Sequence, residues 1–146
     1  MRSLALFSAA LLVALVSCKS HKPVPLDKSE AADLPQAAVL QKLREMLPTS
    51  EYVNCTGPKL TLKPTDITTW TVENDAIGID YGRGNALRLP FAEVTDVRRE
   101  AVGKFFHVRV FTQIQPERDR PHFEFVFRIQ ERAKEVGELI LAMKKR

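Results

Sequence analysis

The chain has 146 residues, of which 45% are hydrophobic and 27% are charged, and its formal net charge is +4. These values are ordinary for a globular protein, and the length predicts a single domain. The modest charge and the lack of a basic run in the interior exclude a typical nucleic-acid-binding chain, so no nucleic acid is expected as a partner.

The first 17 residues have the organisation of a secretory signal peptide. Arg2 supplies a positive charge, and an almost wholly apolar run extends from Leu4 to Val16. A helix that spans a bilayer needs about 20 apolar residues, so this run is too short to span one and has the length of a signal-peptide core. We therefore interpret residues 1–17 as a signal peptide that is removed.

The end of this run resembles the lipobox of bacterial lipoproteins, and the resemblance is carried by Leu15, Val16, Ser17 and Cys18. It implies cleavage between Ser17 and Cys18, thioether attachment of diacylglycerol to Cys18, and acylation of the new amino group, as with palmitate. Several acyl chains hold a protein stably, because each buried methylene contributes about 0.8 kcal/mol. The implied address is the bacterial cell envelope, and Lys19 after the cysteine favours the outer membrane, facing the periplasm.

The lipobox leaves the second cysteine without an intramolecular partner. If Cys18 carries lipid, Cys55 cannot form an internal disulfide, even in an oxidising compartment. Cys55 is expected to be a small buried hydrophobic residue. An intermolecular disulfide and a redox-active thiol stay open as alternatives.

A tether and a helix are predicted next. Residues 18–32 contain prolines and polar residues with little hydrophobic bulk, which is typical of a flexible lipidated tether that reaches about 20 Å as a random coil. Apolar residues then recur at helical spacing, and Pro48 ends the pattern. The sequence therefore predicts a helix over 33–48 that packs on the following domain.

Residues 52–146 predict a β-rich domain that closes with one helix. Seven strands are expected from the period-two alternation of apolar residues. Their ranges are 59–63, 67–73, 76–81, 86–89, 94–102, 104–113 and 122–128. In the last strand Phe123, Phe125 and Phe127 alternate and are expected in the core. A stripe of apolar residues predicts a helix over 130–144.

Seven antiparallel strands followed by one amphipathic helix resemble the pleckstrin-homology-like (PH-like) fold. The segment from Leu89 to Val97 is similar to the step before a middle strand in bacterial PH-like proteins. The resemblance implies an α+β, mostly β fold: two nearly orthogonal sheets that form a partly open barrel, capped by the C-terminal helix. The first hairpin offers only Lys59 and Lys63, so binding of phosphoinositide headgroups is not implied.

The titratable residues do not combine into a catalytic or metal site. The three histidines are His21, His107 and His122, and the predicted hairpin places the last two about 17 Å apart, too far to share a metal. His122 and Glu124 share a strand face, which is a weak metal signal and more typical of exposed alternation. No serine follows Ser50, so the β-rich domain has no serine nucleophile. We expect no catalytic residues, no metal, no cofactor and no enzyme activity.

Basic residues offer the only candidate contact surface. Arg98, Arg99 and Lys104 surround one predicted turn, and Arg118 and Arg120 lie in a long loop. They either form a surface for an anionic partner or the membrane, or are a solvated face neutralised by neighbouring carboxylates. The sequence predicts a membrane-tethered, non-catalytic lipoprotein that binds an envelope protein or component. The alternative is a carrier that holds a small apolar ligand between sheet and helix.

Overall fold

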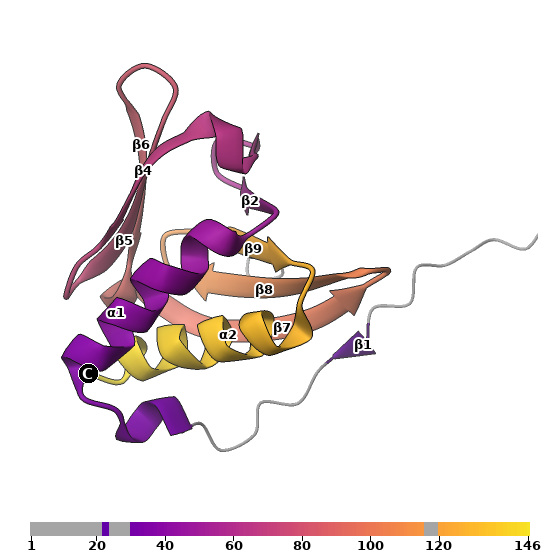
Figure 1. Cartoon of the computed structure of the whole chain (residues 1–146). Helices are drawn as coiled ribbons and strands as arrows, with labels where there is room; N and C mark the ends of the chain where they lie inside the picture. The colour runs from indigo at the N-terminus through magenta and orange to yellow at the C-terminus, as the bar shows by residue number, and fades with distance from the viewer. Residues whose placement is uncertain (1–21, 24–29, 116–119) are drawn as a thin grey trace, which may run out of the picture.

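The computed structural model describes residues 22–23, 30–115 and 120–146. The predicted signal peptide, the residues Ser17 and Cys18 at its cleavage site, and Arg118 lie outside the described residues. The described part is an α+β structure with two antiparallel sheets and a C-terminal helix (Figure 1).

The larger sheet has six strands in the order β1-β7-β8-β9-β2-β3, and all neighbours are antiparallel. Its strands are β1 (Lys22–Pro23), β2 (Tyr52–Cys55), β3 (Leu60–Leu62), β7 (Val94–Val102), β8 (Phe105–Thr112) and β9 (Phe123–Phe127). The strand β2 therefore lies between β9 and β3 and pairs with both. This pairing brings residues near 52 and near 125 side by side.

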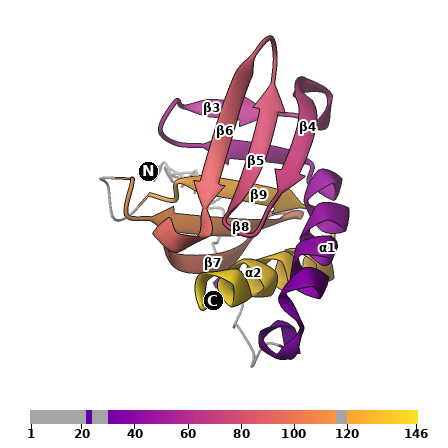
Figure 2. The same cartoon turned by 90° about the vertical axis from the view of Figure 1, so that its left-hand side faces the viewer.

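The smaller sheet is a meander of β4 (Ile67–Val72), β5 (Ala76–Tyr81) and β6 (Asn85–Pro90). Gly82 and Gly84 adopt positive φ angles of 58° and 75° in the turn between β5 and β6, which glycine does without a steric cost. Figure 2 shows the strands of the smaller sheet crossing steeply over those of the larger one. Ile77, Ile79 and Leu89 on its inner face are buried in this contact.

The core lies between the two sheets and the helices. The predicted core position of three phenylalanines in β9 is confirmed, because Phe123, Phe125 and Phe127 are each at most 1% exposed. The residues between them, Glu124 and Val126, are buried as well. The helix α2 (Gln130–Lys144) has the predicted bounds and packs on β7, β8 and β9. The predicted apolar stripe of α2 is buried: Ala133, Val136, Leu139, Ile140 and Met143.

The first helix is shorter than predicted. The helix α1 (Gln36–Met46) is flanked by two 3₁₀ segments, η1 (Glu30–Asp33) and η2 (Leu47–Thr49). A proline near each end explains the difference from the predicted range 33–48, since Pro35 precedes the first helical residue and Pro48 lies in the tighter turn. Arg44 fixes α1 to the smaller sheet by donating hydrogen bonds from Nε and an Nη to the carbonyl oxygen of Val72, at 3.0 and 2.7 Å.

The structure contains two strands that the sequence analysis did not predict. The strand β2 has only four residues, and β1 has two and lies within the segment 18–32 that we expected to be a free tether. In the same segment Ala31 is 5% exposed in the core. Parts of the expected tether are therefore docked on the domain.

Candidate functional site

The predicted basic residues do not form one surface. Arg98 is exposed, pairs with Asp96 at 2.8 Å and lies over the ring of Phe111 at 4.4 Å. Lys104 is exposed in the turn between β7 and β8, and Arg120 is exposed just before β9. The three described exposed residues thus belong to different parts of the larger sheet.

Arg99 does not belong to the exposed basic residues. It is only 4% exposed, because the alternation of β7 turns Val97 and Arg99 towards α2. Gly137 makes room for it, since a Cβ at position 137 would lie 3.2 Å from Cδ of Arg99. The sequence signal for this close approach is Gly137, a glycine inside an otherwise regular amphipathic helix.

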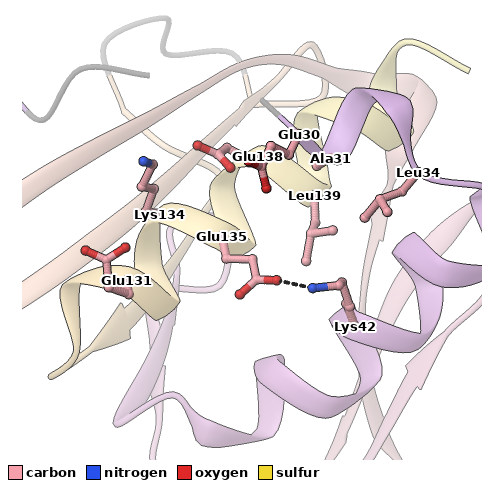
Figure 3. A pocket seen from close by; sticks show the side chains of 9 residues that line it. All are labelled: Glu30, Ala31, Leu34, Lys42, Glu131, Lys134, Glu135, Glu138 and Leu139. Carbon is pink, nitrogen blue, oxygen red and sulfur yellow. Dashed lines mark hydrogen bonds and ion pairs between the residues drawn. The ribbon is translucent and has the colours of Figure 1, made fainter. Parts of the chain in front are cut away.

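A groove of about 400 Å³ lies between η1, α1 and α2 (Figure 3). Its lining residues are Glu30, Ala31, Leu34, Lys42, Glu131, Lys134, Glu135, Glu138 and Leu139. The charged ends of four glutamates and two lysines surround a small apolar patch. Lys42 donates to Glu135 at 2.5 Å, and this hydrogen bond together with the charge of Glu135 raises the pKa of Lys42. These lining residues include no histidine, cysteine or serine.

A second polar arrangement crosses the face of the larger sheet that points away from α2. Here one residue from each of five adjacent strands lies in register: Thr61, Asn54, Glu124, Arg109 and Arg98. Asn54 accepts a hydrogen bond from Thr61 at 2.9 Å and donates one to Oε1 of Glu124 at 2.8 Å. The central carboxylate of this row is 8% exposed.

Arg109 and His107 complete the surroundings of Glu124. Arg109 donates from Nε to Oε2 of Glu124 at 2.7 Å, and its Nη1 lies 2.7 Å from Glu100. Nδ1 of His107 lies 3.1 Å from Oε1 of Glu124. Burial alone would raise the pKa of Glu124, but the contacts with His107, Asn54 and Arg109 outweigh it and lower the pKa to about 2.

These contacts connect adjacent strands of the larger sheet, and they use both carboxylate oxygens of Glu124 as hydrogen-bond acceptors. Both oxygens of Glu124 already have partners, and its lowered pKa makes the carboxylate a poor proton acceptor at neutral pH. His122, which the sequence paired with Glu124 as a weak metal signal, instead bonds to the hydroxyl of Thr112 through Nδ1 at 2.8 Å. Among residues 22–23, 30–115 and 120–146, no group of three histidine, cysteine, aspartate or glutamate side chains could hold a metal.

The expected role of Cys55 as a small buried hydrophobic residue is confirmed. Its side chain is in the core at 2% exposure, and burial raises the pKa of its thiol. A buried thiol with a raised pKa is a poor nucleophile, because the thiolate is the reactive form.

In comparisons with known proteins, no family model, no curated protein and no solved structure matches this chain. Within the described residues, no helix is long and apolar enough to cross a membrane.

Proposed function

We propose that this protein is a lipid-anchored, non-catalytic binding module of the bacterial cell envelope. The observation that carries the proposal is the motif from Leu15 to Cys18 at the end of a short apolar run. The anchor is the acylated Cys18, and Lys19 directs the protein to the outer membrane, where the domain faces the periplasm. Its partner is an envelope protein or component close to the membrane.

We propose further that the domain is a variant of the PH-like fold. The support is its two antiparallel sheets with steeply crossing strands, followed by a C-terminal helix that packs on the larger sheet. The variant adds β2 and β1 to the seven strands of the expected pattern. In this reading α2 is the capping helix.

The filled core favours a binding module over a carrier of small apolar ligands. The space between α2 and the larger sheet is occupied by side chains that are at most 1% exposed, among them Phe123, Phe125 and Leu139. The groove of about 400 Å³ lies outside this core and has a charged rim. Apolar ligands prefer enclosed, predominantly apolar sites. The groove suits a polar segment of a partner better.

The anchor is tested with the two cysteines of the chain. Cells that express the wild type, Cys18→Ala or Cys55→Ala are fed radiolabelled palmitate and fractionated. We expect label and membrane association in the wild type and in Cys55→Ala, and neither in Cys18→Ala. A Cys18→Ala protein that is labelled and remains in the membrane fraction would disprove the proposal. Separation of inner and outer membranes on a density gradient tests the outer-membrane address.

The binding role is tested by photo-crosslinking in intact cells. A photoreactive residue replaces Glu131 at the rim of the groove, and another replaces Arg83 in the turn between β5 and β6. A discrete adduct that depends on Cys18 supports a partner near the membrane. The absence of any such adduct from either position, with normal membrane association, contradicts a binding module.

A further inference from the structure

The short strand β1 fixes where the anchored end of the domain lies. It pairs antiparallel with β7, with Lys22 opposite Ala101 and Pro23 opposite Glu100. Since β7 runs from Val94 to Val102 and then enters the turn at Gly103, the amino end of β1 points towards the turn between β7 and β8. Figure 1 shows β1 beside β7 at this end of the sheet.

The number of residues before β1 limits the distance to the anchor. Four peptide steps separate Cys18 from Lys22. A fully extended chain spans at most about 3.5 Å per residue, so Cys18 lies within roughly 14 Å of Lys22. The link from Cys18 to β1 is therefore shorter than the 15-residue tether expected from the sequence. Such a short link restricts rotation of the domain relative to the bilayer.

The surface at this end of the domain has the composition of a membrane-contacting surface. We call it the turn end and define it by Lys104, Phe105, Arg128 and Ile129. Lys104 and Arg128 lie 5.5 and 5.8 Å from the centre of the Phe105 ring. Ile129 is 49% exposed, one of two large hydrophobic residues that are exposed in the described part of the chain.

The contacts of Arg128 keep it at the surface. Its side chain is 61% exposed, and its Nε lies 3.2 Å from Glu51. Tyr52 supports the ring of Phe105 edge-on, with 6.0 Å between ring centres. Aromatic rings with cations beside them and an exposed aliphatic side chain suit the boundary between lipid headgroups and water.

We propose that the turn end rests on the bilayer and that β1 is the clamp that holds it there. This inference rests on the proposed lipid anchor. Headgroups with negative charge contact Lys104 and Arg128, while Phe105 and Ile129 reach the interface. The turn between β5 and β6, which both views place on the far side of the molecule from β7, points away from the membrane (Figures 1 and 2).

The orientation is measured on the full lipidated protein in vesicles that contain anionic phospholipid. Cys18 is blocked by lipid and Cys55 is buried, so a fluorophore attaches to one introduced cysteine. Gln130→Cys places the probe next to the turn end, and Arg83→Cys places it in the turn between β5 and β6; both positions are exposed. Lipids with a nitroxide quencher in the bilayer should quench the probe at 130 several times more than the probe at 83. Equal quenching overturns the inference.

The surface contacts are tested by charge removal in the Gln130→Cys protein. Each Lys or Arg at an anionic surface changes partitioning by roughly fivefold, so Lys104→Gln with Arg128→Gln should lower the ratio of docked to undocked protein by up to about 25-fold. The matched control is Lys59→Gln with Arg88→Gln, which also removes one exposed lysine and one arginine in an exposed ion pair. If both pairs of substitutions act equally, the turn end is not the contact.

The clamp is tested by lengthening the chain before β1. Fifteen Gly/Ser residues inserted between Lys19 and Ser20 add about 20 Å of reach. The probe at position 130 should then lose most of its quenching while the protein stays on the vesicles. Unchanged quenching shows that β1 does not hold the orientation. A wild-type protein that leaves the vesicles would overturn the proposed lipid anchor, and with it this inference.

Discussion

Replacement of Glu124 by glutamine tests whether a buried carboxylate holds the larger sheet together. The substitution keeps the size of the side chain and removes its charge. In the wild type this carboxylate accepts from Asn54 at 2.8 Å and from Arg109 at 2.7 Å. In the variant an amide NH₂ or a neutral oxygen faces Arg109, so the ion pair with position 124 is lost and Glu100 is the carboxylate that still pairs with the guanidinium.

The magnitude follows from the lowered pKa. The pKa of Glu124 falls from 4.5 to about 2 on folding. Each pKa unit corresponds to about 1.4 kcal/mol, so the charged form contributes roughly 3 kcal/mol to the free energy of unfolding at neutral pH. Because the pKa is lower in the folded state, this contribution is complete above about pH 5. It is lost as the pH falls through 4.5 towards 2.

The assay is urea-induced unfolding of the chain from Lys19 onward, followed at pH 7, 5 and 3. We expect Glu124→Gln to be less stable by about 3 kcal/mol at pH 7, and the difference to shrink by about 2 kcal/mol at pH 3. Glu51→Gln is the control, because its ion pair with Arg128 is solvent-exposed and contributes under about 1 kcal/mol at any of these pH values. A difference that is below 1 kcal/mol at pH 7, or that does not change with pH, would refute the reasoning.

Three further predictions concern the core. Phe125→Ala should lower the free energy of unfolding by about 3–5 kcal/mol and shift the fluorescence of Trp70 to the red, because the two rings lie 6.3 Å apart and Phe125 is fully buried. In a Cys18→Ala protein, Cys55 should react with a thiol reagent only slowly until urea is added; rapid reaction in buffer would contradict its burial. Burial lowers the pKa of His122, so its NMR titration midpoint should lie below 6.5, and the stability from its neutral form, complete above about pH 6.5, should decline as the pH falls.

The regular elements could be predicted because their patterns are local. In β7 and α2 the predicted bounds are confirmed. In α2 an apolar stripe continues over fifteen residues, and in β7 the turn residue Gly103 marks the end of the strand. The predicted strand at 76–81 also has the observed bounds in β5, because Asp75 and Gly82 mark its two ends with turn residues. Long runs with clear ends carry their own structural signal.

The strands β1 and β2 could not be found in this way. The four residues Tyr52–Cys55 are too few for a pattern, and Lys22–Pro23 has none. Both become strands because of their partners: β2 lies between β3 and β9, and β1 lies against the edge of β7. The pairings of β2 with β9 and of β1 with β7 join residues 68 to 79 positions apart, which a single sequence does not reveal.

The same limit applies to the polar groups. From the sequence, Arg98 and Arg99 were grouped on one surface, although neighbouring residues of a strand point to opposite faces. Arg99 was therefore assigned to the surface although it is 4% exposed. Glu124 was regarded as part of an ordinary exposed alternation with His122, although its carboxylate meets Arg109 at 2.7 Å across two strands. The register of β8 against β9 decides this contact, because it places Arg109 opposite Glu124.

The two faces of the larger sheet leave few places for a partner. One face is covered by α2 and the smaller sheet, and the other is held together by the saturated network around Glu124. At Glu100 and Ala101 the edge of β7 is paired with β1, so a further strand could not bind there without displacing the clamp. If the turn end faces the bilayer, the described surfaces that remain accessible include the groove between the helices and the turn between β5 and β6. A partner that competes with the membrane for Lys104 would be expected to displace the domain from the bilayer, while a partner in the groove would leave its orientation unchanged.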